Sequence, residues 1–448
     1  VTGLVMFTSG AVKVSNITST NTSSGAGLLI DNSTYAASPM PVSVMGAVLN
    51  DNFTMGLLVR SKGNIIVAGI TALENGFTSQ LRNNYPNTTG SVIISGALGL
   101  NQFNDTTEGS GLVITTLRNV NVSSLQANGN PDSGLSILAE GPASNVTLTN
   151  VEINENSGLN SSPGITITAT GNVILDRLAV SENGREGIVV DNSMALTPRL
   201  VRISSTSAND NTREGIKVNS VGAITLVNVT ASGNSLNGAT LTNRVTTLLP
   251  QGITVQKSTF DNNGARGLLL ESQRTISLVS INASYNASNG LQANNAFGGS
   301  TSPIVITGVN RFISNGLGGA SNGMNLNTNG ALTLSGITVS WSGFNGIGAS
   351  SGSVQNTLRN ILVQGNNQNG IHIITLGNTL MNGITSIQNS QDGVRISANT
   401  AKVSIANSVV LGNGVYGLSF NVNTPATDVY VAPSTVVLGN AGGNFYIY

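Results

Sequence analysis

The sequence predicts an all-β protein whose short strands repeat as the coils of one solenoid. The first observation is composition: 8% of the 448 residues are charged, whereas 60 are Asn and 54 are Gly, types that favour turns over helices. The second is a glycine-marked repeat with a base period of about 23–24 residues. The third is strict alternation of apolar and variable side chains after each repeat glycine. Together they predict a parallel β-helix of about 17 three-strand coils.

The strand after each repeat glycine carries the clearest pattern. In the stretch 183–193, Ile188 and Val190 are apolar while Val189 lies between them, and Ile216 and Val218 repeat the pattern around Lys217. Period-two alternation is typical of a strand with one buried face. Two further short strands follow in each repeat, as in residues 223–234. We therefore expect the first and third positions to face the core and the second position to face solvent.

An asparagine regularly stands four residues before the repeat glycine. Equivalent residues of successive coils lie about 4.8 Å apart, which is close enough for their amides to stack and hydrogen-bond. The sequence therefore predicts a structural asparagine ladder. Its predicted members are Asn130, Asn154, Asn183, Asn211, Asn234, Asn263, Asn286, Asn366, Asn389 and Asn413.

The repeats NGREGIVVDNS, NTREGIKVNS, NNQNGIHII and NSQDGVRISAN resemble the parallel β-helix repeat of the pectate-lyase-like superfamily. The resemblance covers nearly the whole chain and implies right-handed coils in a single domain over residues 1–448. The resemblance is specific for the fold and weak for the function. The superfamily includes polysaccharide lyases and hydrolases, tailspikes, adhesins and surface-layer-like proteins, so the fold does not select among these functions. Function must therefore come from particular side chains.

The outward strand positions carry few groups able to do chemistry. The outward second position after each repeat glycine holds no carboxylate, and its titratable side chains are Lys217, His372 and Arg395. His372 and Arg395 lie one coil apart, and we interpret His372 as a solvated surface residue. An acidic patch consists of Asp176, Glu182, Glu186, Asp191, Asp210 and Glu214. We interpret it as an ion network with Arg185 and Arg213, so the sequence predicts no catalytic residue, no metal site and no cofactor.

Charge and hydropathy narrow the partners and the location. The net charge is zero, and we expect no nucleic-acid partner because no cluster of Lys and Arg occurs. No apolar run reaches the length of a membrane span. The lack of Cys excludes disulfides and thiolate metal sites. The chain starts at Val1 without a signal-like segment, as expected if a leader has been removed, so we expect a secreted, extracellular or cell-surface protein in which glycans remain open as partners. Candidate N-glycosylation sites are Asn16, Asn21, Asn32, Asn52, Asn87, Asn104, Asn121, Asn145, Asn228 and Asn282.

Both ends of the sequence match the repeat strand, which predicts uncapped terminal coils. Head-to-tail stacking of such ends would generate a homopolymer. The predicted assembly residues are Leu4, Val5, Met6, Phe445, Tyr446, Ile447 and Tyr448. The favoured hypothesis is therefore a non-enzymatic structural subunit of an extracellular filament or sheath. Two alternatives stay open: a carbohydrate-active enzyme, as a polysaccharide lyase, hydrolase or tailspike-like depolymerase using the acidic patch, and a monomeric adhesin.

Overall fold

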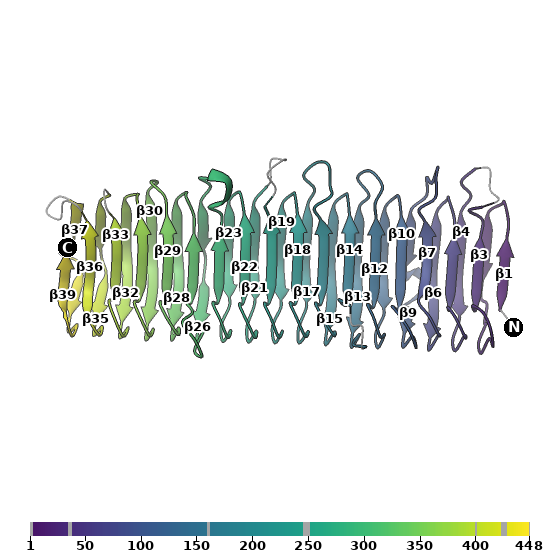
Figure 1. The fold of residues 1–448 in the computed structure, drawn as a ribbon, viewed down its shortest axis with the longest axis horizontal. Helices are drawn as coiled ribbons and strands as arrows, with labels where there is room; N and C mark the ends of the chain where they lie inside the picture. Colours follow the sequence, from purple (N-terminus) through teal and green to yellow (C-terminus); the bar gives the residue numbers. More distant parts are fainter. Residues whose placement is uncertain are drawn as a thin grey trace. The chain divides into compact units, whose positions relative to one another are not determined.

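The computed structural model describes residues 3–34, 38–158, 162–244, 251–398, 401–422 and 428–447, so Tyr448 lies outside the described residues. Contacts between residues divide the chain into an N-terminal unit, Val1–Val221, and a C-terminal unit, Gly222–Tyr448. Each unit is described by itself, and the single domain over residues 1–448 stays a prediction. Figure 1 shows that in each unit short strands lie side by side in successive coils.

Each coil of the N-terminal unit contributes one strand to a first sheet and one or two strands to a second sheet, all paired in parallel. The first-sheet strands are Leu4–Phe7 (β1), Leu28–Asp31 (β3), Leu57–Arg60 (β5), Ser79–Asn83 (β7), Leu112–Thr116 (β10), Leu135–Ala139 (β12), Ile165–Ala169 (β14), Ile188–Asn192 (β16) and Ile216–Ser220 (β18). The second-sheet strands are Val12–Ser15 (β2), Val42–Val48 (β4), Ile65–Leu73 (β6), Val92–Ser95 (β8), Asn101–Asn104 (β9), Val120–Gln126 (β11), Val146–Asn154 (β13), Val173–Ser181 (β15) and Val201–Ser207 (β17). A short 3-10 turn, Gly96–Leu98 (η1), separates β8 from β9.

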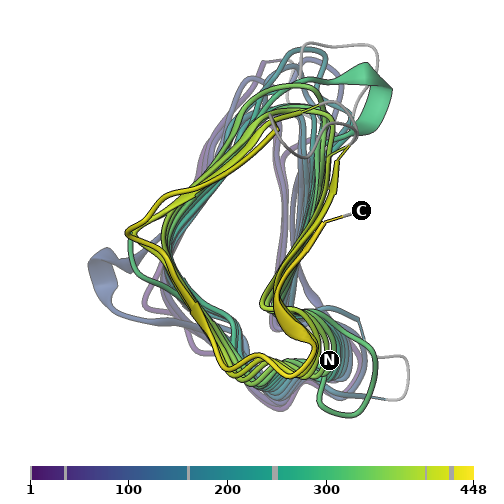
Figure 2. The ribbon, with the colours of Figure 1, turned by 90° about the vertical axis from the view of Figure 1, so that its left-hand side faces the viewer.

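The C-terminal unit repeats this plan, and its coils overlay one another in Figure 2. The first-sheet strands are Ala239–Asn243 (β20), Leu268–Ser272 (β22), Leu291–Asn294 (β24), Met324–Asn327 (β27), Ile347–Ser351 (β29), Ile371–Thr375 (β31), Val394–Ala398 (β33), Tyr416–Val422 (β36) and Gly443–Ile447 (β39). The second-sheet strands are Ile224–Thr230 (β19), Ile253–Thr259 (β21), Ile276–Asn282 (β23), Ile304–Thr307 (β25), Asn310–Ile313 (β26), Leu332–Ser340 (β28), Asn356–Gln364 (β30), Thr379–Ile387 (β32), Val403–Ala406 (β34), Val409–Leu411 (β35), Val429–Val431 (β37) and Val436–Leu438 (β38). A 3-10 turn, Phe297–Gly299 (η2), follows β24.

The interior is built from apolar side chains stacked in register. In β16 and β18, Ile188 pairs with Ile216 and Val190 with Val218, and all four side chains are buried. The outward Val189 pairs with Lys217 between them. Burying each such aliphatic side chain stabilises the fold by about 1.5–3 kcal/mol. The alternation predicted from sequence is confirmed, and with it the all-β parallel β-helix.

The predicted second and third strands of a coil are often one strand with a left-handed bend. In β13 the bend is Asn150, with φ 52°, and in β30 it is Asn360, with φ 51°. Asn tolerates positive φ better than most side chains because its short amide can hydrogen-bond locally. The bend turns the chain by a sharp angle without an extra loop, so one residue makes a corner of the coil.

A buried asparagine ladder runs through each unit. In the N-terminal unit the Nδ2 atoms of Asn130, Asn156 and Asn183 each donate to the Oδ1 atom of the next ladder Asn at 3.0 Å, and the last acceptor is Asn211. In the C-terminal unit the same side-chain bond, at 2.8–3.1 Å, links Asn234, Asn263, Asn286 and Asn315, and then Asn366, Asn389, Asn413 and Asn440. Ser342 stands between these two runs, and its backbone N–H donates to Asn366.

Asn154 is a correction to the predicted ladder. Its side chain is half-buried and its Nδ2 donates to Glu152, while the buried ladder position is taken by Asn156. The prediction counted back four residues from Gly158, but strand β14 begins at Ile165. Extra residues between the turn and the strand therefore shifted the count by two positions.

Candidate functional site

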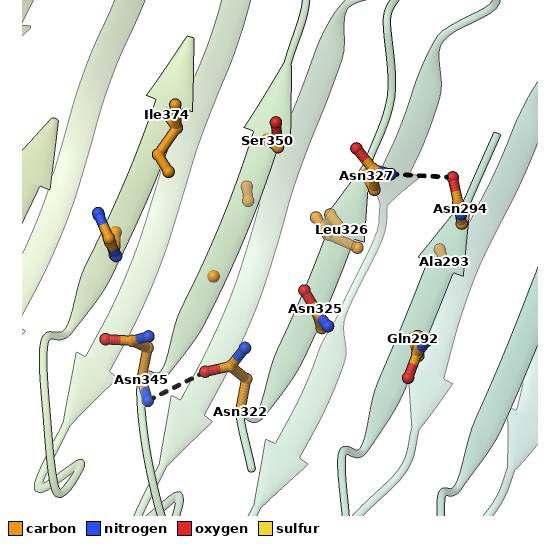
Figure 3. A pocket seen from close by; sticks show the side chains of 13 residues that line it. Gln292, Ala293, Asn294, Asn322, Asn325, Leu326, Asn327, Asn345, Ser350 and Ile374 are labelled. Carbon is orange, nitrogen blue, oxygen red and sulfur yellow. Dashed lines mark hydrogen bonds between the residues drawn. The ribbon is translucent and has the colours of Figure 1, made fainter. Parts of the chain in front are cut away.

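A shallow groove lies on the outward face of the first sheet in the C-terminal unit, with a volume of about 400 Å³ (Figure 3). Its floor and walls come from β24, β27, β29 and β31 and from the turns that precede β27 and β29. The lining residues are Gln292, Ala293, Asn294, Asn322, Asn325, Leu326, Asn327, Asn345, Gly348, Ala349, Ser350, His372 and Ile374.

The depth of the groove comes from a missing side chain. Strand register places Asn325 beside Gly348 and Gly348 beside His372, so these residues occupy the same outward position in successive coils. Gly348 has no side chain to fill the space between its neighbours. A Cβ atom there would meet Nδ2 of Asn322 at 2.7 Å. The glycine therefore makes room for the Asn322 amide, which lies against it in the groove.

Fixed amides form the walls of the groove. The backbone N–H of Asn345 donates to Oδ1 of Asn322 at 3.1 Å, and Nδ2 of Asn327 donates to Oδ1 of Asn294 at 3.2 Å (Figure 3). Asn345 is buried, and its own Oδ1 accepts from Nδ2 of Asn369 at 2.9 Å. Because these bonds repeat from coil to coil, the amide donors and acceptors are held in place before any ligand binds.

His372 is the titratable side chain of this groove. Burial lowers its pKa from the ordinary value, and the Arg395 guanidinium lowers the pKa further, whereas Asp392 opposes the shift. His372 and Arg395 are register partners in β31 and β33, about 4.8 Å apart along the stack. The imidazole is therefore neutral near neutral pH and able to accept a proton, next to a fixed positive charge.

The described outward positions from β24 to β33 hold no carboxylate. They are Gln292, Asn294, Asn325, Asn327, Gly348, Ser350, His372, Ile374, Arg395 and Ser397. The groove is thus polar and rich in amides, and His372 at its β31 end lies near both Arg395 and the buried Asp392. This chemistry fits the hydroxyl groups of sugars and, near Arg395, an anionic group.

Three of the six members of the acidic patch, Asp176, Glu186 and Glu214, form ion pairs on the N-terminal unit. Glu186 is buried and lies 3.5 Å from Nε of Arg185 and 3.5 Å from Nε of Arg213, which is also 3.9 Å from Glu214. Asp176 pairs with Arg177 at 2.6 Å. No group of three acidic or His side chains able to hold a metal ion occurs among the described residues. The diagonal pairing matches the interpretation drawn from sequence.

Three of the candidate glycosylation sites need correction. Asn32 and Asn52 are fully buried, and their amides donate to Gly10 and Met40 and to Asn75, respectively. Asn104 is buried and donates to Gln126. A glycan cannot be attached to an amide enclosed in this way. The remaining sites stay predictions: Asn16, Asn21, Asn87, Asn121 and Asn228 are exposed, and Asn145 and Asn282 are half-buried.

The predicted assembly residues lie on strands of the two units. Leu4, Val5 and Met6 pair with β3, and Phe445, Tyr446 and Ile447 pair with β36. The Tyr446 ring stacks on Tyr416 with ring centroids 4.5 Å apart. These contacts are internal to each unit, and self-association through these residues stays a prediction.

Comparison with known proteins agrees with the fold. A family profile described as "Right handed beta helix region" matches residues 100–250 and 302–446. No curated protein sequence matches the chain. No helix among the described residues is long and apolar enough to cross a membrane.

Three solved structures share the fold. The A-module of Azotobacter vinelandii mannuronan C-5 epimerase AlgE6 is 15% identical, with a TM-score of 0.42 over 88% of this chain and 90% of that chain. The A-module of A. vinelandii mannuronan C-5 epimerase AlgE4 is 12% identical, with a TM-score of 0.37 over 86% of this chain and 89% of that chain. The periplasmic alginate epimerase AlgG is 11% identical, with a TM-score of 0.29 over 92% of this chain and 80% of that chain. The family profile confirms the resemblance at the level of the fold, a right-handed β-helix.

These neighbours correct the favoured hypothesis of a non-enzymatic filament subunit. All three are named as epimerases of mannuronan or alginate, which runs against the prediction of a non-enzymatic filament subunit and is in line with the carbohydrate-active alternative. At 11–15% identity the likeness shows the fold alone. Substrate and reaction must therefore be argued from the groove.

Proposed function

We propose, since the chain belongs to the right-handed β-helix family, that it is a carbohydrate-active protein that binds an acidic polysaccharide along the groove of its C-terminal unit. The observation that carries the proposal is His372 beside Arg395 at the end of an amide-lined groove. The register of β31 and β33 holds the two side chains together. The open, shallow shape suits an extended polymer.

Charge selects the class of polymer. Arg395 offers a planar guanidinium cation, whose geometry suits a carboxylate. Gln292, Asn325 and Asn327 supply donors and acceptors for hydroxyl groups. A chain of uronic acid residues matches both features, because each of its rings carries hydroxyl groups and a carboxylate.

The reaction class follows from a neutral base next to a carboxylate-binding cation. His372 takes the proton from the ring carbon that bears the carboxylate, and Arg395 stabilises the negative charge that moves onto the carboxylate oxygens. The C–H bond breaks and its electron pair enters the enolate. Either the enolate pair then forms a double bond to the next carbon while the glycosidic oxygen there leaves with its own C–O bonding pair and takes up a proton, which is elimination, or a proton from solvent adds to the opposite face of the ring carbon, which is epimerisation. Both outcomes need the same first step.

A polysaccharide substrate also suggests where the protein is located. Acidic polysaccharides of this kind are cell-surface and extracellular polymers, so we assign the protein to the secreted or extracellular space.

The test is proton exchange in D₂O. The protein is incubated with polymannuronate, polygalacturonate or hyaluronan, and NMR follows deuterium entering the ring while ultraviolet absorbance follows unsaturated products. We expect exchange or elimination on at least one polymer, and His372→Ala should reduce the rate by about 10²–10⁴-fold. Lys217→Ala, an outward titratable residue of the N-terminal unit, is the matched control and should leave the rate unchanged. No exchange and no elimination on any of the three polymers would overturn the proposal.

A further inference from the structure

A second exposed feature of the C-terminal unit is a corner of the coil that carries two aromatic side chains. The corner position is the residue just before each ladder position, and Tyr285, Ser314, Trp341, Gly365 and Gln388 occupy it in successive coils. The backbone N–H groups of Tyr285, Ser314 and Trp341 donate to Ile313, Ser340 and Gln364 of the next coil, which confirms that these positions stack. Tyr285 and Trp341 are 58% and 50% exposed.

Trp341 adopts a backbone conformation that bulky residues rarely take. Its φ is 58°, and Tyr285 has φ 60°. Left-handed backbone is common for Gly and Asn but unfavourable for a large aromatic residue, and the fold imposes it at this corner of most coils. Folding alone would be served better by the Gly or Asn that other coils place at this corner, such as Gly412 and Asn262.

The next coil is shaped to receive the Trp341 ring. A Cβ atom on Gly365 would lie 2.4 Å from Cε3 and from Cζ3 of Trp341, so the indole rests directly on the Gly365 backbone. Any other residue at position 365 would push the ring away. The indole is therefore supported on one side by the protein, while half of the side chain remains open to solvent.

The chemistry around the two rings favours a sugar chain over a protein. The corner position carries no charge in the described coils of this unit, and Ser314 separates the rings instead of joining them into an apolar patch. The two rings lie two coils apart, about 10 Å. Flat, separated aromatic faces flanked by a hydroxyl and an amide match the alternating C–H faces and hydroxyl groups of an extended polysaccharide.

We propose that Tyr285 and Trp341 form an aromatic ridge that binds a polysaccharide by its ring faces, independently of the carboxylate. The turn that carries Trp341 also carries Asn345, which lines the groove. The ridge thus holds the chain beside the groove where His372 acts. The identity of the polymer rests on the proposed function, whereas stacking of sugar rings on the ridge does not.

The chain contains one Trp, so intrinsic fluorescence reports on the ridge directly. The probes are polymannuronate and β-1,4-mannan oligosaccharides, which share ring stereochemistry and differ in the carboxylate. We expect both to change the Trp341 emission, and isothermal titration should show Trp341→Ala and Tyr285→Ala each weakening mannan binding about tenfold or more. Phe53→Ala removes an aromatic side chain of the N-terminal unit that is 62% exposed and should leave affinity unchanged.

The outcomes separate the two proposals. Unchanged fluorescence with both probes, or mannan affinity unaltered in Trp341→Ala and Tyr285→Ala proteins that circular dichroism shows to be folded, overturns the ridge while leaving the groove chemistry intact. A fluorescence response without deuterium exchange supports the ridge and overturns the proposed reaction. Arg395→Ala should weaken polymannuronate binding alone, and equal weakening for mannan would contradict the independence of the ridge from the carboxylate.

Discussion

The two units of the chain share an interior and differ on the surface. Both units stack aliphatic side chains beside a buried asparagine ladder, in which the hydrogen bonds between side-chain amides are 2.8–3.1 Å long. At the corner just before the ladder position, the N-terminal unit places exposed acids and the C-terminal unit places uncharged residues. The acids are Asp51, Glu74, Asp105, Glu155, Glu182 and Asp210, and the uncharged side chains are Asn262, Tyr285, Ser314, Trp341 and Gln388.

The two units also differ in the side chains at the outward positions of their first-sheet strands. In the N-terminal unit they are mainly aliphatic or hydroxylic, as at Leu58, Val113 and Thr166, whereas the C-terminal unit presents amides, His372 and Arg395. Folding requires an inward apolar residue and a left-handed corner, and both units satisfy these conditions. The outward side chain is free to vary, so if the chain binds an acidic polymer as proposed, these differences favour the C-terminal unit, because the acidic corner of the N-terminal unit would repel such a polymer.

The largest expected effect comes from filling the groove. Gly348→Val adds a side chain where a Cβ atom already meets Asn322 at 2.7 Å, and it should weaken polyuronate binding about tenfold or more by closing the site and displacing the amide. Isothermal titration measures the effect. Thr166→Val makes a matched change on β14 of the N-terminal unit, and a loss of affinity there would show that binding is not confined to the C-terminal groove.

The shared interior predicts equal costs in the two units. Asn183→Ala and Asn389→Ala each remove one ladder amide and leave buried partners unpaired, which should lower the free energy of unfolding by about 1–3 kcal/mol. Chemical denaturation measures both. Asn382→Ala, at an exposed position of β32, is the control and should have little effect. A large cost in one unit with none in the other would break the comparison.

His372 is the single His of the chain and lies in the C-terminal unit, so we expect the stability of this unit to depend on pH through its titration. Burial lowers the pKa of His372 below its ordinary 6.5, so the unfolded chain binds a proton more readily than the folded one. His372 should therefore contribute stability fully above pH 6.5, and this contribution should be lost as pH falls through the folded pKa. His372→Gln should flatten stability against pH in that window, and an unchanged slope would show that the imidazole is not enclosed in the groove.

The smallest effect concerns the acidic corner. Glu182 and Asp210 stand in successive coils with like charges, so Glu182→Gln with Asp210→Asn should raise stability by about 0.2–0.5 kcal/mol at low salt. The gain should vanish at high ionic strength because exposed charges are screened. Thermal unfolding at two salt concentrations measures it. A gain that persists in high salt would mean that the acids act through something other than repulsion.

Much of the fold could be read from the sequence, because strand alternation and coil period are set by residues close together along the chain. Ile188 and Ile216 are assigned to the core by pattern alone, and Asn183, Asn263 and Asn389 are assigned to the ladder by a fixed distance from the repeat glycine. Where an insertion separates ladder and strand, that distance changes. Asn156 and Asn315 were therefore missed, although each is fully buried.

The candidate site could be read only in part. The sequence placed His372 and Arg395 one coil apart, but it could not show that His372 is half-buried, that Gly348 opens a groove beside it, or that the Trp341 ring rests on Gly365. These facts depend on contacts between side chains from different coils. The sequence by itself determined which residues point inward and how coils repeat, because periodicity is local. The tertiary structure alone decided which outward residues meet, because insertions set the register between distant side chains and neighbouring coils set their exposure.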